Sequence, residues 1–256
     1  MSVTQKEKFV QPYTHLAEIY DDVMDHVDYE KWAHYIDKIA RSHNLERSDM
    51  LDISCGTGSL CFYLEQLGYN AFGSDSAVLM LRQARRRARQ KEYCAHFWCA
   101  DMVRPSTRKR FNLIVSLYDS MNYLLHDEEW LSCFKVVANS LSSTGLFIFD
   151  ISTIKNSLRY FNAFVHQEKI RQGKYKRHSY FDVNTKIQTN LFKIFFHRIP
   201  ELIFIEEHRQ RIRTLKEILK IINQSPLDVL AYYDDFNFQK GSEDSDRIHF
   251  ILKKTE

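Results

Sequence analysis

Apolar and polar positions follow two alternating patterns through the middle of the chain. Short runs rich in apolar residues, as expected of strands buried on both faces, occupy positions 50–53, 70–75, 95–102, 111–117 and 145–151. Apolar residues at helical spacing lie between these runs over 59–67, 76–90 and 127–141. This alternation predicts an α/β fold, with a mostly parallel sheet and helices on both of its faces.

The two flanks of this region differ in pattern. Residues 1–45 carry two helical stripes, and 213–256 carry a helix over 214–222, with Thr214 and Glu217 in capping-box spacing, followed by a terminal hairpin. Aromatic and β-branched runs, which predict an inserted antiparallel sheet, occupy 162–171, 174–181, 187–197 and 202–211. We therefore predict four parts: an N-terminal helical cap (1–45), a core (46–160), an inserted β lid (161–212) and a C-terminal helix and hairpin that complete the core (213–256).

Composition limits the classes of protein. The 256 residues are 44% hydrophobic and carry a formal net charge of +3, which does not by itself imply a nucleic-acid partner. No apolar run reaches membrane-spanning length and the N-terminus has no apolar signal core, so we expect a cytoplasmic protein without a membrane partner. The five cysteines form no C-x-x-C pair and the histidines have no zinc-ligand spacing, so we predict reduced, buried cysteines and no metal site.

One basic run stands out, at positions 82–91. On a helix, Met80, Ala84 and Ala88 would line the buried side while most of the arginines face water. We interpret the run as a solvated helix face; an RNA-binding patch is the alternative.

The most informative segment is 50–58, with the sequence Met-Leu-Asp-Ile-Ser-Cys-Gly-Thr-Gly. It predicts a buried strand that ends in a glycine turn and opens into a helix, which is the usual ligand crevice of an open α/β sheet. Gly56 and Gly58 allow positive φ and close approach of a ligand. A dinucleotide fingerprint would have a third glycine where Cys61 stands, and a P-loop would have a Lys-Ser/Thr pair that is absent here.

The segment resembles the first motif of class I S-adenosylmethionine (SAM) methyltransferases, with Asp52, Ser54, Gly56 and Gly58 at the motif positions and Ser54 where the family usually has glycine. The resemblance implies a seven-stranded, mostly parallel sheet with an antiparallel last strand. It also implies that SAM is the cofactor. Acids at the ends of the next two predicted strands strengthen it, since such acids converge on one crevice edge.

The resemblance further implies roles for single residues. Asp75, followed by Ser76 as a helix cap, would accept hydrogen bonds from the ribose hydroxyls. Asp101 would bind the adenine amine, Met102 would pack on the ring, and the Leu117 carbonyl would accept from the SAM amine. Tyr20 resembles a leading-helix tyrosine that holds the methionine carboxylate; plain packing is its alternative. Each acid could instead be a helix cap or turn former.

The methyl acceptor would face the segment after the fourth strand. Asp119, Asn122 and Tyr123 are its polar groups, with a capped loop as the alternative. The Asp/Asn-Pro-Pro-aromatic and Pro-Cys motifs of nucleobase methylases are absent. In the inserted sheet, alternation sets Glu206, His208 and Gln210 on one face. Imidazole is a common general base, so His208 is a catalytic candidate as well as a structural one.

Three functions remain open at this point. The leading hypothesis is methyl transfer from SAM to a nitrogen or oxygen of a small molecule, by a monomer or homodimer. An RNA or protein methyltransferase is the second, with the arginine-rich helix as contact surface. A non-catalytic SAM-binding module is the third, because Ser54 replaces a glycine and no essential base is evident. The sequence does not identify the acceptor.

Overall fold

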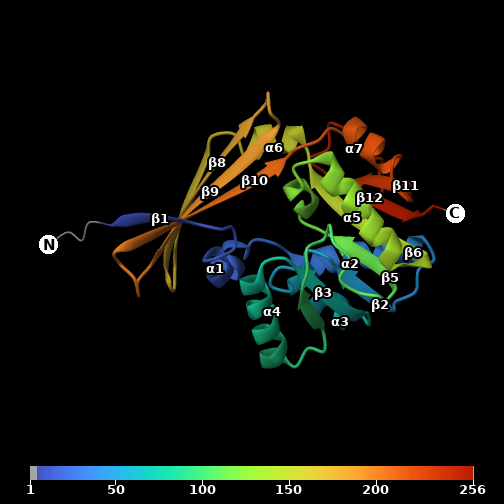
Figure 1. Cartoon of the computed structure of the whole chain (residues 1–256), viewed down its shortest axis with the longest axis horizontal. Helices are drawn as coiled ribbons and strands as arrows, with labels where there is room; N and C mark the ends of the chain where they lie inside the picture. The colour runs from blue at the N-terminus through green and yellow to red at the C-terminus, as the bar shows by residue number, and fades with distance from the viewer. Residues whose placement is uncertain (1–4, 256) are drawn as a thin grey trace.

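The computed structural model describes residues 5–255, which form two β-sheets lying side by side (Figure 1). The larger sheet has seven strands in the order β11-β12-β6-β5-β2-β3-β4, and the smaller has five in the order β1-β10-β9-β8-β7. The predicted α/β class, with a mostly parallel sheet, an antiparallel last strand and a second small sheet, is confirmed.

The larger sheet is parallel at its centre and antiparallel at one edge. Its strands are β2 (Asp49–Asp52), β3 (Asn70–Asp75), β4 (His96–Cys99), β5 (Phe111–Ser116), β6 (Leu141–Ser152), β11 (Leu227–Asp234) and β12 (Arg247–Lys254). β2 pairs in parallel with β3 and β5, whereas β12 runs antiparallel to both β6 and β11. The carboxyl ends of β2, β3 and β5 therefore meet at one edge.

Helices cover both faces of this sheet. One face is packed by α5 (Asp127–Ser140) and α7 (Leu215–Ile222), through residues such as Phe134 and Ile218. The other is packed by α2 (Tyr29–Ser42), α3 (Ser59–Gln66) and α4 (Val78–Lys91), through residues such as Ile36, Leu64 and Leu81. The expected capping box at α7 is present, with Thr214 and Glu217 bonding each other's backbone amides.

The basic helix α4 has the predicted orientation. Met80, Ala84 and Ala88 are buried and four of its five arginines are exposed. Arg87 is the exception: it is half-buried and donates hydrogen bonds to the side chains of Asp21, Thr57 and Ser59.

The smaller sheet confirms the inserted strands. It contains β7 (Phe164–Ile170), β8 (Gly173–Asp182), β9 (Ile187–Phe196) and β10 (Leu202–Arg211), joined antiparallel. The predicted alternation along β10 holds, since Glu206, His208 and Gln210 are at most 3% exposed while Glu207 and Arg209 are exposed. Between the sheets lie η1 (Ser120–Tyr123), after β5, and α6 (Ile154–Tyr160), after β6.

Three local expectations were wrong. Residues 6–10 form a strand, β1 (Lys6–Val10), which precedes α1 (Leu16–Val23) and pairs in parallel with the outer edge of β10. Residues 142–145, which we expected to be a turn between the helix over 127–141 and the strand over 145–151, are extended backbone inside β6, where the pairing with β5 shifts register. Cys94 and Cys99 are exposed: Cys99 lies in β4, the edge strand, which lacks a neighbour on one side, and Cys94 lies just before that strand.

Within residues 5–255, the structure contains no helix whose length and apolar character would let it cross a membrane.

Candidate functional site

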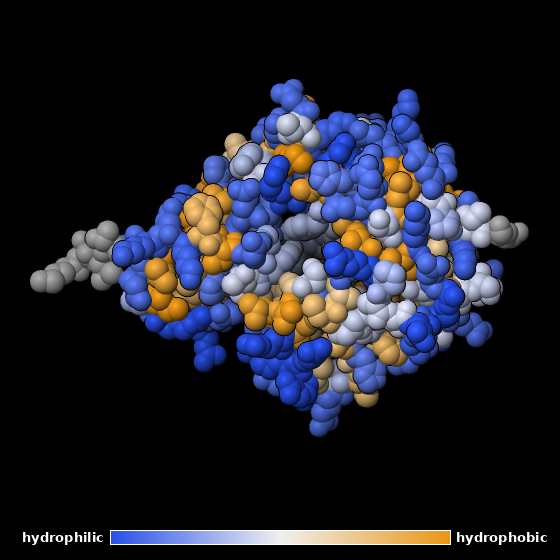
Figure 2. Space-filling view, viewed as in Figure 1, coloured by the Kyte–Doolittle hydropathy of each residue, from blue (hydrophilic) through white to orange (hydrophobic). Residues whose placement is uncertain are grey.

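A cavity lies between the two sheets, at the carboxyl ends of β2 and β5. The space-filling view shows the hollow between the smaller sheet and the body of the molecule (Figure 2). The larger sheet contributes the segment after β2 and the segment after β5, and the smaller sheet contributes inward-facing residues of β8, β9 and β10. α1 lies against the opening with Leu16, Tyr20 and Val23.

The glycine turn forms one wall of this cavity. Gly56 has φ +54° and Gly58 has φ +81°, so both adopt the left-handed conformation that glycine tolerates best. Ser54 does not have positive φ, and its side chain lines the cavity, so serine satisfies the motif position. Gly58 does not line the cavity; a Cβ there would lie 2.8 Å from the ring of Phe97, which explains the glycine as a packing requirement.

Asp52 lies at the base of the same wall. It is 4% exposed and accepts a hydrogen bond from the Ser54 backbone amide at 2.9 Å. Burial raises the pKa of Asp52 to about 7, although the hydrogen bond from Ser54 acts in the opposite direction. Among residues 5–255, no basic side chain forms an ion pair with it. A cation in the cavity would therefore stabilise the ionised carboxylate.

Asp75 stabilises the turn from the end of β3. Its carboxylate accepts hydrogen bonds from the Gly56 amide at 2.9 Å and the Ala77 amide at 2.8 Å. Burial raises the pKa of Asp75, and these two bonds oppose the shift. The prediction that Ser76 caps the next helix was wrong: Ala77 occupies the cap position, without a side-chain bond, and Ser76 is exposed. The carboxylate of Asp75 instead accepts the hydrogen bond from the backbone amide of Ala77.

Asp101 and Met102 are not part of the cavity. They line a separate small hollow with residues such as Leu51 and Ser74. Asp101 is exposed and accepts a bond from the backbone amide of Val103.

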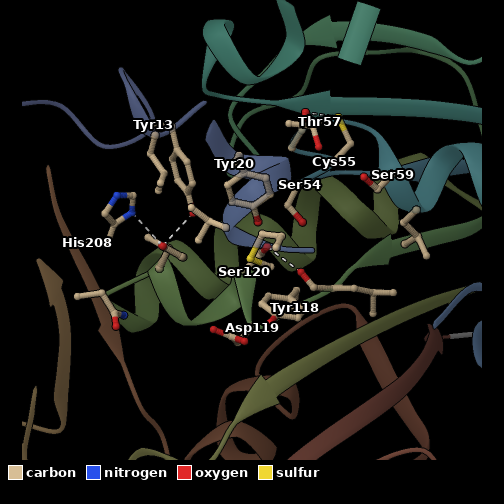
Figure 3. A pocket seen from close by; sticks show the side chains of 18 of the residues that line it. Tyr13, Tyr20, Ser54, Cys55, Thr57, Ser59, Tyr118, Asp119, Ser120 and His208 are labelled. Atoms are coloured by element: carbon tan, nitrogen blue, oxygen red, sulfur yellow. Dashed lines mark hydrogen bonds between the residues drawn. The ribbon is translucent and has the colours of Figure 1, made fainter. Parts of the chain in front are cut away.

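α1 is tied to the glycine turn by side chains. The Thr57 hydroxyl donates to Asp21 at 2.6 Å, and Arg87 donates to both residues. Tyr20, the neighbour of Asp21, faces the cavity (Figure 3). Leu117 also lines the cavity, at the end of β5. Tyr20, Asp52, Ser54, Gly56 and Leu117 are thus the predicted cofactor residues that the fold brings together.

On the acceptor side, a row of polar groups in contact links three segments of the chain. The Tyr13 hydroxyl donates to the Tyr123 hydroxyl at 2.8 Å, which lies 3.1 Å from His208 Nδ1. His208 Nε2 lies 3.4 Å from Glu206. Figure 3 shows Tyr13 and His208 on the same side of the cavity. Burial raises the pKa of Tyr123, so the phenol stays protonated at neutral pH.

Glu206 holds this row to the start of α1. Its carboxylate accepts hydrogen bonds from the backbone amides of Tyr13, His15 and Leu16. Burial alone would raise the pKa of Glu206, but nearby His208 and the backbone amides of His15 and Leu16 outweigh burial and lower the pKa. Glu206 is therefore ionised at neutral pH and would stabilise a protonated His208.

Asp119 lines the cavity as part of an ion network. Arg247 Nη2 donates to Asp119 at 2.9 Å and Arg247 Nη1 pairs with Asp150. Gln210 Nε2 donates to the other oxygen of Asp119 at 2.5 Å. Burial raises the pKa of Asp119 while Arg247 opposes this shift. Asp119 is therefore fixed on several sides.

Asn122 does not meet the expectation that it joins Asp119, Tyr123 and His208 in one cavity. It is 1% exposed, its amide donates to the Arg211 carbonyl at 3.2 Å, and it does not line the cavity. Asn122 therefore links η1 to β10 through this hydrogen bond and does not face the cavity.

Sequence reasoning missed several cavity residues. Tyr13, Tyr118, Arg177, Asn190 and Arg247 all line the cavity. Arg177 and Asn190 share the inward face of the small sheet with His208. His208 pairs with Asn190, and Asn190 pairs with Ser179. Arg177 is two residues before Ser179 on β8, so both side chains lie on the same face of the sheet. Alternation within β8 and β9 would have shown which residues share a face. The register of pairing between β8, β9 and β10, which sets these residues beside His208, could not be read from the sequence.

Comparison with known proteins agrees with this geometry. Residues 50–145 match a family model described as a methyltransferase domain. A crystal structure of a SAM-dependent methyltransferase from Clostridium acetobutylicum superposes with a TM-score of 0.81 at 27% identity, covering 95% of this chain and 99% of that one. Residues 50–145 thus form a methyltransferase domain, and nearly the whole chain is similar to a SAM-dependent methyltransferase, so the non-catalytic alternative is set aside.

Two further relatives and one solved structure are similar to different shares of this chain. The Bacillus subtilis protein named "Putative methyltransferase YqeM" is 25% identical over 247 residues, 95% of this chain and 98% of the relative. A dTDP-3-amino-3,4,6-trideoxy-alpha-D-glucopyranose N,N-dimethyltransferase from Streptomyces venezuelae is 30% identical over 122 residues, 47% of this chain and 49% of the relative. The sugar N-methyltransferase KedS8 from Streptoalloteichus has the same fold, with a TM-score of 0.79 at 15% identity, covering 100% of this chain and 99% of that one.

Proposed function

We propose that this enzyme transfers the methyl group of SAM to a nitrogen or oxygen of a small-molecule acceptor held between the two sheets. The observation that carries the proposal is the shared cavity: the glycine turn and Asp52 form one side, and Tyr123 and His208 form the other. The N-methyltransferase names of two relatives support a small amine-bearing acceptor.

The residues around the glycine turn fit the cofactor. SAM brings a methyl group on a positively charged sulfur, and Asp52 is a buried carboxylate without a basic partner among the described residues. Tyr20, Ser54, Gly56 and Leu117 would hold the cofactor beside it. Asp75 is not among the residues that line the cavity, but its carboxylate accepts from the Gly56 amide and would accept from the ribose beside the glycine turn. For Asp101 and Met102, a role at the adenine would require the hollow they line to join the cavity.

The row on the opposite side suits an acceptor that must lose a proton. Tyr123 would accept the proton from the nucleophile as its own hydroxyl proton moves to His208 Nδ1, 3.1 Å away. The Glu206 carboxylate, 3.4 Å from His208 Nε2, would stabilise the resulting imidazolium. The ion pair with Arg247 would hold Asp119 in place, so that Asp119 could accept a hydrogen bond from the molecule that receives the methyl group.

Steady-state kinetics test this assignment. The full chain, incubated with SAM and a panel of small amines and alcohols, should release S-adenosylhomocysteine with the true acceptor, detected by mass spectrometry. Tyr123→Phe and His208→Gln should each lower kcat by roughly 10²-fold while SAM affinity changes less than about twofold. Tyr180→Phe, at an exposed position of β8, is the matched control. If both variants keep wild-type kcat, the row has no part in proton transfer.

A further inference from the structure

Arg177 is a half-buried cation in the cavity wall that no acid of the described chain neutralises. It extends from β8 on the inward face of the smaller sheet and lines the cavity. Its Nε and Nη2 atoms donate to neutral oxygens, those of Ser179 and Asn190, at 2.9–3.1 Å. Across residues 5–255, no carboxylate lies within ion-pair distance of its guanidinium.

The surroundings of Arg177 keep it fixed and poorly hydrated. The rings of Phe161, Phe164 and Phe192 lie 4.9, 5.9 and 5.8 Å from its guanidinium carbon. Burial lowers the pKa of Arg177, and Tyr118 and Asp119 act in the opposite direction. A guanidinium nevertheless stays protonated at neutral pH. A charge that is partly removed from water and has no acid partner is costly.

The other arginine that lines the cavity, Arg247, is already paired with acids, which makes Arg177 different. Arg247 bonds both Asp119 and Asp150. The oxygens of Asp119 accept bonds from Arg247 and Gln210 and lie outside ion-pair distance of Arg177, so Asp119 influences Arg177 only through space. The positive charge of Arg177 is therefore left to a ligand.

Two hydrogen-bond donors beside this charge are also unused. Asn190 Oδ1 accepts bonds from Arg177 and, at 2.6 Å, from Ser179, so its amide nitrogen must point elsewhere. Neither that nitrogen nor Arg177 Nη1 has a hydrogen-bond partner in the part of the chain that the structure describes. Both residues line the cavity. A guanidinium edge beside an amide donor suits an oxyanion.

We propose that Arg177 and Asn190 form a subsite for an oxyanion, a carboxylate or a phosphoryl group, on the methyl acceptor. The inference rests on the proposed function and narrows it to acceptors with one anionic group besides the nucleophile. Asn190 pairs with His208 across β9 and β10, so the anion would lie beside the proposed base. It would thus fix the orientation of the nucleophile against Tyr123.

Calorimetry on the full chain, saturated with S-adenosylhomocysteine, tests the subsite. The probes are inorganic phosphate, acetate and acetamide, the last being a neutral match for acetate. Phosphate or acetate should bind to the wild type and acetamide should not; the tighter of the two anions identifies the class. Arg177→Gln should weaken anion binding by roughly tenfold or more. Arg209→Gln, an exposed arginine of β10 that faces away, should bind as the wild type does.

The outcomes separate this inference from the proposed function. If the wild type binds S-adenosylhomocysteine but neither anion, or if Arg177→Gln binds the anions normally, the subsite is wrong and the proposed function stands. If Arg177→Gln instead loses SAM affinity to the same extent, Arg177 serves the cofactor carboxylate and the subsite is again wrong. Failure of the wild type to bind SAM would overturn the proposed function itself.

Discussion

Asp52 shows how one buried side chain can connect stability with cofactor binding. Its pKa of about 7 in the folded protein lies above the usual aspartate range near 4. Between those values the folded state binds more protons than the unfolded state, so the free energy of unfolding falls as pH rises. The folded protein thus holds a carboxylate whose ionisation costs stability, and a bound cation would offset that cost.

Asp52→Asn should therefore change binding and stability in opposite directions. Asparagine can still accept from the Ser54 amide, but it cannot ionise. We expect SAM affinity to fall by roughly tenfold at pH 8, with a smaller difference at pH 6, where part of the wild type is protonated. The unfolding free energy of the variant should fall less than that of the wild type between pH 5 and pH 8. Calorimetry and urea unfolding at both ends of the range measure these effects, and equal SAM affinities at pH 8 would contradict the role.

At the scale of elements, the strand–turn–helix unit of β2 and α3 depends on two positive φ angles. The Gly56 amide donates to Asp75, and Gly56 lines the cavity. A Cβ at Gly56 would lie 3.2 Å from the Met80 side chain. Since φ is +54°, any L-residue there is strained as well.

Gly56→Ala and Gly68→Ala separate strain from function. Gly68 follows the C-cap of α3 with φ +98°, and a Cβ there would make only ordinary contact, 3.8 Å from the Arg47 side chain. Both variants should therefore lose about 1 kcal/mol of unfolding free energy from backbone strain. Only Gly56→Ala should also lose SAM affinity, by tenfold or more, because the turn lines the cavity. Thermal unfolding and calorimetry compare the two. Equal SAM affinity in both variants would mean that the turn does not contact the cofactor.

At the scale of the whole molecule, Arg247 joins the two sheets. It extends from β12, pairs with Asp150 of β6, and holds Asp119, which in turn bonds Gln210 of the smaller sheet. Burial raises the pKa of Asp119 and of Asp150, and Arg247 opposes both shifts. Loss of the arginine would leave two buried carboxylates without their cation.

Arg247→Gln should destabilise the fold by about 3–5 kcal/mol near pH 8. Without the arginine, both carboxyls would titrate higher in the folded state, so the loss should shrink as pH falls and they become protonated. Urea unfolding of wild type and variant at pH 5.5 and pH 8 measures the difference. A loss that is independent of pH would show that packing, and not charge, is what Arg247 supplies.

Cofactor binding should also stabilise the whole fold. SAM at about 100 times its Kd should raise the free energy of unfolding by about 2.7 kcal/mol through mass action, seen as a higher melting temperature. NAD serves as the control and should give no comparable shift, since Cys61 stands where the third glycine of a dinucleotide fingerprint would be. An equal shift with NAD would contradict the assignment of the turn.

The sequence by itself determined the elements and the identity of the glycine turn. Buried strands need uninterrupted apolar runs and amphipathic helices need a stripe, so β2, β5, α4 and α5 were readable within a few residues. Gly56 was readable because few other residues tolerate its φ. Alternation along β10 identified the buried face that carries His208.

Only the tertiary structure decided which functional side chains lie in the same cavity. β1 became a strand because β10 had an unpaired edge, and no local pattern records an edge. Arg177 and Asn190 reached the cavity through the register of β8, β9 and β10, and a shift of one residue would have turned them to solvent. Asp101, Met102 and Asn122 have the residue types expected of a site, yet contacts distant in sequence placed them outside the cavity. Local sequence determines which segments form helices and strands. The pairing of strands that are distant in sequence determines which side chains lie close together, and therefore which of them form the site.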